Sequence, residues 1–438
     1  MTINKTGTLW LTAMCMIWAS ATGFAQNMNP SNLTASPYTR YGFGKLGTVG
    51  NASTRAMGDV GIAVRTNQYT NLYNPASLTA IDTLTLLFDV GIDAEWYTVS
   101  ENGKHEQDWN AGFSYMTFHF PLWNRFAGAI AYTPYSMVGY EYGNEAETPI
   151  DNTLINSDTL VYSNTNSGSG GLQHFQLALA WEPVKTRTQT MSLGLKAGYI
   201  CGTVTHSGSM YVSSGQSNST YVNRDFSARG WDLLLGVQYS RLLSPSRRVI
   251  VGATFSPRTH IGVDSEVIKY SGTDTIGQNL TKNLSLSAPM KAGGGITYQI
   301  DRKLTVSAEY SFENWKNVAG LDANLNKQDG VYRNITRVAA GAEYRPKVYS
   351  QSYLQTCLYR AGVSYKNSYI ESYGSSNKEF SVTCGVAFPT LNKRSLLSIS
   401  AAYTRIQPSK SGMLSENYLH LTLGVTFNEM MFYRSRLR

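Results

Sequence analysis

The sequence predicts an all-β protein: a transmembrane antiparallel β-barrel of about 14 strands with an N-terminal hatch or plug in its lumen. The main observation is that apolar and polar residues alternate at every second position through most of the 438 residues. Only 15% of the residues are charged, which is low for a soluble enzyme, whereas 12% are aromatic. After the first 25 residues, no segment approaches the roughly 18 consecutive apolar residues of a membrane-spanning helix.

Residues 1–25 have the features of a secretory signal peptide. Lys5 precedes an apolar stretch from Leu9 to Trp18, and small residues flank Phe24 at the expected cleavage site after Ala25. We therefore expect an exported protein, located as a multi-pass protein in the outer membrane of a Gram-negative bacterium.

Residues 26–82 show no sustained alternation. They are rich in glycine and moderately apolar, and a barrel of fourteen strands is wide enough to need filling or to conduct. Asn74 and Pro75 are a good start signal for a short helix, because Asn caps a helix and Pro suits its first turn. We expect this segment to form a plug inside the lumen.

Residues 83–427 carry the alternation that predicts the barrel. From Leu84 to Trp96, apolar side chains face one side and residues such as Asp89 and Asp93 face the other. Comparable runs are centred near residues 90, 114, 131, 177, 196, 235, 252, 295, 308, 340, 362, 384, 400 and 422. The run near residue 114 is the least regular, because Phe113 and Met116 fall on different faces.

The connections between these runs alternate between long and short. The first, third and later odd connections span about 10 to 31 residues, and the even ones about 5 to 10, as in outer-membrane barrels with long outer loops and short periplasmic turns. Residues 141–171 and 207–227 are predicted to be polar outer loops that could bind a protein partner. Tyrosines near strand ends could form the interfacial aromatic girdles.

A soluble β-sandwich would also alternate, but it would carry charge on its exposed face. Here the polar face is rich in Ser, Thr, Gly and Ala, with only occasional charges. A lipid bilayer is therefore the expected neighbour of the apolar face.

Two motifs ahead of the barrel resemble the FadL-type family of outer-membrane transporters. Residues 55–63, with the sequence RAMGDVGIA, are followed by residues 71–78, NLYNPASL, and together they look like the N-terminal hatch of that family. The residues that carry the resemblance are Arg55, Gly58, Asn74, Pro75 and Ala76. The resemblance implies a plugged barrel of fourteen strands that passes a hydrophobic ligand, with lateral release through a kink in the third strand.

Pro134 lies in the third predicted strand and has two interpretations. Proline cannot donate a ladder hydrogen bond, so it could create a lateral gate in the barrel wall. Alternatively, it only ends the strand at the outer rim.

The first strand places Asp89, Asp93 and Glu95 on its polar face. One hypothesis is that these carboxylates anchor the hatch, with Arg55 as a partner. The alternative is that they belong to a hydrated wall of the lumen.

The expected function is transport of a hydrophobic small molecule, fatty-acid-like or otherwise lipophilic, through the plugged barrel. The alternative is a FadL-like barrel that acts as a protein-secretion shuttle or surface interaction protein. An open porin is a further possibility, against which the plug argues.

Other functions have little support in the sequence. The six histidines are isolated, so we expect no enzymatic activity, metal site or cofactor. The cations are scattered, which argues against nucleic acid despite a net charge of +8.

The end of the chain bears on membrane insertion. Phe427 closes the last apolar stripe and could be the aromatic signal read by the outer-membrane assembly machinery, with Phe432 as the alternative. Residues 428–438 are expected to form a basic C-terminal tail.

Overall fold

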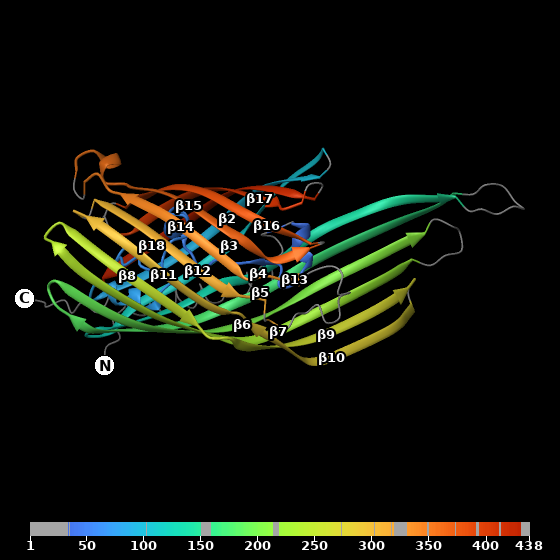
Figure 1. Cartoon of the computed structure of the whole chain (residues 1–438), viewed down its shortest axis with the longest axis horizontal. Coiled ribbons are helices and arrows are strands. Elements are labelled where there is room, and N and C mark those ends of the chain that lie inside the picture. The colour runs from blue at the N-terminus through green and yellow to red at the C-terminus, as the bar shows by residue number, and fades with distance from the viewer. Residues whose placement is uncertain are drawn as a thin grey trace, which may run out of the picture.

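Alternating side chains let each strand face lipid on one side and the lumen on the other, and the computed structural model shows the resulting closed antiparallel barrel (Figure 1). It describes residues 34, 36–101, 103–149, 159–212, 219–272, 274–301, 303–316, 318, 331–347, 350–372, 374–390, 394–410 and 413–430. The expected signal peptide lies outside these residues. The barrel closes where the last strand pairs with the first, from Ser415 opposite Ser100 to Met430 opposite Thr85.

Fourteen strands form the wall, as the sequence predicted. In chain order they are β2 (Thr85–Glu101), β3 (Lys104–Trp123), β4 (Phe126–Pro149), β5 (Thr159–Lys185), β6 (Gln189–Val212), β7 (Thr220–Ser244), β8 (Arg247–Ser256), β11 (Met290–Ile300), β12 (Leu304–Asn314), β14 (Ile335–Tyr344), β15 (Leu358–Ser372), β16 (Ser375–Pro389), β17 (Leu396–Pro408) and β18 (Ser415–Met430). Each of the fourteen predicted centres lies inside one of them. Because β18 extends to Met430, residues 428–430 belong to the last strand, and residues 431–438 of the expected tail lie outside the described residues.

A β-bulge explains the irregular run near residue 114. Gly91 pairs with Tyr115 and Ile92 with Phe113, so Ser114 is the extra residue. The bulge reverses the side-chain alternation, which puts Phe113 and Met116 on the same outer face although their spacing is odd. It also turns Tyr115 into the lumen, where it is buried.

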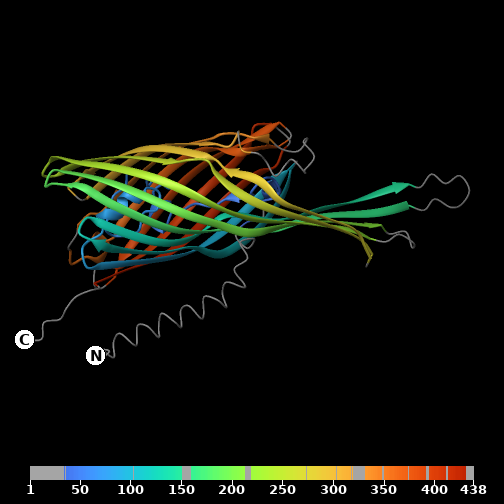
Figure 2. The same ribbon diagram turned by 90° about the horizontal axis from the view of Figure 1, so that it is seen from below.

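The long polar loops predicted at residues 141–171 and 207–227 were wrong in part, because strands continue through most of both segments. β4 to β7 are 24 to 27 residues long, and β9 (Thr259–Ser271) and β10 (Asp274–Ala288) add a further hairpin beside β7. We call this structure the outer extension: residues 133–149, 159–173, 201–212, 220–229, 259–271 and 274–288. It projects beyond the other strands at one end of the barrel (Figures 1 and 2). At about 3.3 Å per residue, residues 159–173 span roughly 50 Å.

Aromatic side chains mark the two edges of the lipid-facing band. At the inner edge, Phe126 and Trp181 stack with their ring centroids 6.1 Å apart. At the outer edge, Tyr199 and Trp231 are 4.8 Å apart. Between these edges the outward residues of β5 are leucines, as in an outer-membrane barrel.

The outward face changes character beyond the second aromatic row. Thr203 and Ser227, four residues beyond Tyr199 and Trp231 along β6 and β7, join their hydroxyls at 3.0 Å. Serine, threonine and asparagine continue on this face, including Thr205, Ser207 and Asn223. The outer extension therefore presents a polar surface where the lower wall presents an apolar one.

Residues 34 and 36–82 form the N-terminal segment, which lies inside the barrel (Figure 2) and contacts its wall strands. It contains the 3₁₀ helices η2 (Pro37–Arg40) and η3 (Pro75–Ala80), the short helix α2 (Ala52–Arg55) and the strand β1 (Lys45–Leu46). None of the helices in the described part of the chain is long and apolar enough to cross a membrane.

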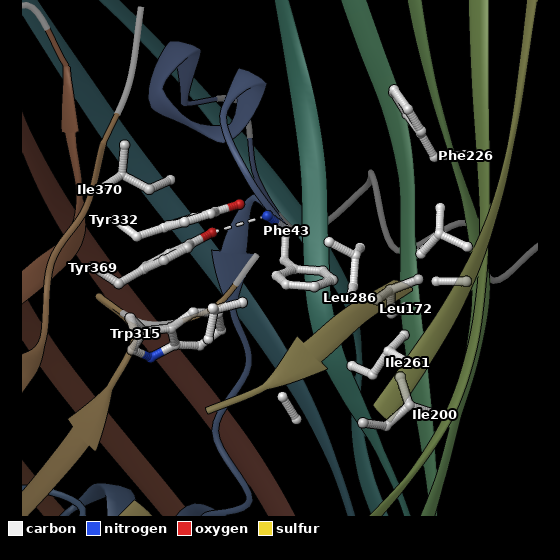
Figure 3. Close-up of a cluster of buried hydrophobic side chains, with 14 of the residues drawn as sticks. Phe43, Leu172, Ile200, Phe226, Ile261, Leu286, Trp315, Tyr332, Tyr369 and Ile370 are labelled. Carbon is white, nitrogen blue, oxygen red and sulfur yellow. Dashed lines mark hydrogen bonds between the residues drawn. The ribbon is translucent and has the colours of Figure 1, made fainter. Parts of the chain in front are cut away.

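The largest apolar cluster lies inside the barrel and not in a separate domain (Figure 3). Phe43 of the N-terminal segment packs between aromatic residues on one side and aliphatic residues on the other. Its ring centroid is 5.9 Å from that of Trp315, and its backbone N–H donates to the hydroxyl of Tyr369 at 3.2 Å. The cluster joins the N-terminal segment to strands from both halves of the barrel.

Candidate functional site: the lumen and its N-terminal segment

The asparagine-proline motif of the N-terminal segment is bonded directly to the barrel wall. The Asn74 side chain caps η3 by accepting from the N–H of Ala76 at 3.1 Å. Its Nδ2 donates to the carbonyls of Ile62 at 2.8 Å and of Val237 in β7 at 3.1 Å. Asn74 is fully buried, so these bonds replace hydration that the amide has lost.

Glycines of the wall make room for the segment. A Cβ atom on Gly236 would lie 2.1 Å from Oδ1 of Asn74, and one on Gly194 would lie 2.3 Å from the backbone nitrogen of Ala76. A Cβ on Gly362 would similarly lie 2.2 Å from the nitrogen of Gly58. Wall backbone therefore contacts segment backbone at Gly194 and Gly362 and the Asn74 side chain at Gly236, which is how the wall and the motif residues fit together.

The three first-strand carboxylates each contact the N-terminal segment. Asp93 Oδ1 lies 3.4 Å from Nη1 of Arg55, and Asp89 accepts from the Asn51 amide at 2.9 Å. Glu95 lies 2.5 Å from Nζ of Lys45. Although burial opposes the charge of Arg55, the nearby carboxylates, Asp93 first, raise the pKa of its guanidinium.

Gly58 lies in the turn that follows α2, and its backbone is hydrogen-bonded to the wall. Its φ of +72° is a conformation that glycine adopts without strain, and its N–H donates to Thr383 in β16 at 2.8 Å. Its carbonyl accepts from Arg337 in β14 at 2.7 Å. The hatch-motif residues therefore meet different parts of the wall: Asn74, Pro75 and Ala76 contact β6 and β7, whereas Arg55 and Gly58 reach the opposite strands.

Several residues that anchor the N-terminal segment to the wall were not predicted from the sequence. Glu309 accepts from the N–H groups of Gly61 at 2.8 Å and Ile62 at 3.0 Å. Arg65 pairs with Glu182 at 2.6 Å near the short-turn end of the barrel. Both carboxylates fall on the polar face of an alternating strand, which is the only sequence signal that could have found them.

Pro134 lies inside β4 and not at its end. β3 pairs with β4 as far as Met116 opposite Tyr132. Beyond that point the two strands separate, and the edge of β4 that faced β3 is no longer paired with it. A register shift follows between Pro134 and Ser136 in the pairing with β5. The interpretation that Pro134 ends the strand at the outer rim is therefore wrong, because β4 continues to Pro149.

The N-terminal segment occupies the edge that β3 leaves free. In β1, Lys45 pairs with Met137 and Leu46 with Ser136, and the N–H of Gly47 donates to the carbonyl of Tyr135 at 2.8 Å. We call this junction of β4 with β1 the β4 seam. A wall strand is thus replaced locally by a strand of the N-terminal segment.

A cavity of about 400 Å³ lies in the lumen between the N-terminal segment and the wall. Ionisable and apolar residues both line it. His174 and Asp232 are hydrogen-bonded at 2.7 Å, and Lys291 and Glu313 form an ion pair at 3.3 Å. Tyr73 of the segment also faces it, and burial, followed by the charge of Asp59, raises the pKa of that phenol well above its usual value. The cavity therefore combines charged groups with apolar surface, and the apolar cluster lies nearby.

Within the described residues, no three His, Cys, Asp or Glu side chains are grouped so that they could hold a metal ion. Many polar groups of the lumen instead bond to one another and to backbone, as Arg337 does to Glu309 and to the Gly58 carbonyl. The arrangement is suited to holding a segment of chain in place.

The fold is similar to solved outer-membrane transport barrels at low sequence identity. A FadL homologue from Pseudomonas aeruginosa matches with a TM-score of 0.57 at 14% identity, covering 88% of this chain and 99% of that one. The toluene transporter TodX from P. putida matches at 0.53 and 15%, with 88% and 99% covered. The toluene transporter TbuX from Ralstonia pickettii matches at 0.52 and 16%, with 86% and 97% covered. No curated protein matches in sequence.

A closed barrel of fourteen strands, with the N-terminal segment described above, defines a FadL-like β-barrel of the class found in bacterial outer membranes. The BamG family model matches residues 8–438, almost the whole chain. The protein belongs to the BamG family.

Proposed function

We propose that this protein is a plugged outer-membrane barrel that acts as an interaction protein, associated with the machinery that assembles outer-membrane proteins. The N-terminal segment is its plug, and the outer extension and outer wall are its contact surfaces. The observation that carries the proposal is the way the lumen is built around the segment, with glycines and buried ion pairs placed to hold it.

The contacts of the plug favour a permanent filling over a mobile gate. Arg55, Arg65 and Arg337 each hold it through an ion-paired side chain, at three separate places on the wall. Releasing the plug would strand these partly buried charges and the carboxylates opposite them, which costs several kcal/mol for each broken buried pair. A transport cycle would have to pay that cost repeatedly.

The charged cavity also argues for an interaction role. An apolar ligand gains about 0.8 kcal/mol for each buried methylene, but only if it meets apolar surface. Here part of the ligand would lie against Lys291, Asp232 and other charged groups, and burying these without new polar partners is unfavourable. The family name, BamG, hints at the assembly machinery as the partner.

A second candidate is transport of a hydrophobic small molecule with lateral release. The observation that favours it is the β4 seam, where β3 and β4 part beside Pro134 and the N-terminal segment, through β1, covers the free edge. The likeness to hydrocarbon-transport barrels supports the same idea. The apolar cluster around Phe43, which also includes Leu46 and Tyr135 at the seam, would then be the place where the ligand is held.

Purification under mild detergent separates the two candidates. The membranes would be solubilised without cross-linking, the tagged barrel isolated, and its proteins and extractable lipids identified by mass spectrometry. We expect a stoichiometric complex with an outer-membrane assembly component and no enriched lipophilic ligand. A monomeric barrel that retains one lipophilic compound per chain would instead establish the transport role.

A further inference from the structure

The outer extension has a groove on its concave face, to which neither candidate function assigns a ligand. The groove has a volume of about 400 Å³ and lies between β4, β5, β6 and β7, with η2 of the N-terminal segment at one side. The residues that shape it are Arg40, Tyr140, Asn166, His206, Gly208 and Arg224. It lies beyond the outer aromatic row, at the end of the molecule that faces water.

The groove contains two guanidinium groups and no carboxylate among its described lining residues. Arg40 donates to the hydroxyl of Tyr142 at 2.6 Å, which leaves most of its donors free. Arg224 faces the groove from β7, whereas its neighbour Asp225 points to the opposite face of the strand. Several buried cations of the lumen are paired with carboxylates, as Arg65 is with Glu182 and Arg337 with Glu309. Among the described residues neither guanidinium has a carboxylate partner, and two such groups in one groove mark a place for an anion.

One wall of the groove is a stack of aromatic rings. The Tyr140 ring lies 5.6 Å from that of Tyr142 and 5.8 Å from that of His206, each at an interplanar angle of 29°. The Tyr140 hydroxyl and Nδ1 of His206 are also 2.8 Å apart and hydrogen-bonded. This wall is therefore fixed in place and presents a flat surface.

The floor of the groove is open at Gly208. A Cβ atom there would meet only Oδ1 of Asn166, at 3.5 Å, so the backbone leaves space that a larger residue would fill. Asn164 and Asn166 border that space and are hydrogen-bonded to each other at 3.4 Å. Their remaining amide groups can bond to hydroxyls.

We propose that this groove binds an acidic saccharide. The carboxylate or phosphate of the sugar would pair with Arg40 and Arg224, its ring would lie against the aromatic side chains of Tyr140 and His206, and its hydroxyls would bond to Asn164 and Asn166. An apolar ligand would leave both guanidiniums unpaired, and a bare anion would make no use of the stack or the amides. The combination of cations, ring faces and amides in one groove therefore selects an anionic sugar.

The test measures binding of tetragalacturonate to the full-length barrel in detergent by isothermal titration calorimetry. Maltotetraose, which has the same length without charge, and inorganic phosphate, which has charge without a ring, are the comparison probes. We expect tetragalacturonate to bind at least about tenfold more tightly than either. Equal binding of all three, or no binding of tetragalacturonate, would overturn the proposal. Phosphate that binds as tightly as the saccharide would reduce the groove to a simple anion site and would also refute it.

Three variants locate the site. Arg224→Gln removes one guanidinium, and Gly208→Leu fills the floor while leaving both guanidiniums in place. Arg229→Gln is the matched control, because it makes the same change on the exposed opposite face of β7. We expect the first two to lose about tenfold or more in affinity for tetragalacturonate and the control to lose none. Heat-modifiable mobility on a gel verifies that each variant is a folded barrel, and equal loss in the control would show that only general surface charge is at work.

Discussion

Glu309 and Arg337 form an ion pair across neighbouring strands, with Oε1 and Nη1 2.6 Å apart, and both hold the same loop of the N-terminal segment. Glu309 of β12 accepts from the N–H groups of Gly61 and Ile62 through its other oxygen. Arg337 of β14 donates to the carbonyls of Gly58 and Asp59 at 2.7 and 3.0 Å. The two side chains thus bond to four backbone groups of this loop. Because residues 58–62 form neither helix nor strand, these groups have no partners in regular secondary structure.

The first prediction follows from this pair. Glu309→Gln leaves the buried guanidinium of Arg337 without its counter-charge and weakens the bonds to the loop, so we expect a loss of about 3 kcal/mol in folding stability. The measurement is the urea midpoint for loss of the folded barrel in detergent. Glu379→Gln, at the more exposed pair with Lys366, is the control and should cost about 1 kcal/mol or less. Equal effects of the two substitutions would show that the Glu309 pair does not hold the segment.

The second prediction concerns the fit between wall and segment. Gly194→Ala places a Cβ within 2.3 Å of the Ala76 backbone, so η3 must move away from β6. We expect limited proteolysis to cut between residues 60 and 80 at least about tenfold faster, with a destabilisation of about 1 to 3 kcal/mol. Gly262→Ala is the control, because the nearest atom to its Cβ would be the carbonyl oxygen of Arg229 at 3.7 Å. If both variants resist protease like the wild type, the close packing at Gly194 is not needed.

These two sites show how far the sequence could lead. The alternation around Asp93 correctly predicted an inward carboxylate, because the two faces of a strand follow from parity alone. The same alternation places Gly194 on the inward face of β6, but it could not show that the backbone of Ala76 would contact Gly194 there. Which inward residues meet the segment depends on how its irregular loops cross the lumen, and a sequence without periodicity does not encode that path in any local pattern.

The outer extension was misread for a related reason. Residues 141–171 and 207–227 are rich in Ser, Asn, Thr and Gly, which is typical of loops. The same residues suit strands that face water on their outer side, because no lipid demands an apolar stripe there. Polar composition therefore marked the edge of the bilayer and not the end of the strands.

The third prediction tests the contact between Arg55 and Asp93. Both side chains are mostly shielded from water and 3.4 Å apart, and Arg55 also donates to the carbonyl of Gly50. A double-mutant cycle of Arg55→Ala and Asp93→Asn should give a coupling energy of about 1 to 2 kcal/mol in urea unfolding. Because His420 lies 3.4 Å from Asp93 as well, Asp93→Asn alone should cost more than the coupling energy. Additive effects would mean that the carboxylate belongs only to a hydrated wall.

The fourth prediction concerns the β4 seam. Leu46 of β1 and Ser136 of β4 are directly paired, so cysteines at both positions should form a disulfide on mild oxidation. The native Cys201, Cys357 and Cys384, which are unbridged, would first be replaced by serine. The cross-linked barrel should keep its protein partners if the segment is a permanent plug, and should stop delivering a lipophilic compound if the seam is a lateral exit. A pairing of Leu46→Cys with Tyr142→Cys, farther along β4, should not cross-link, and its formation at a similar rate would show that β1 slides along the edge.

The fifth prediction places the edge of the bilayer. Val237 and Thr205 both point outward, the first below and the second above the row that contains Tyr199 and Trp231. With spin labels on single cysteines at these positions in a lipid bilayer, the label at Val237 should be relaxed mainly by oxygen, which concentrates in hydrocarbon. The label at Thr205 should be relaxed mainly by a water-soluble nickel chelate, because the Ser and Thr residues around it cannot satisfy a hydrocarbon environment. Oxygen-dominated relaxation at Thr205 would place the base of the outer extension in lipid, and the concave groove above it would then no longer be open to a water-soluble ligand.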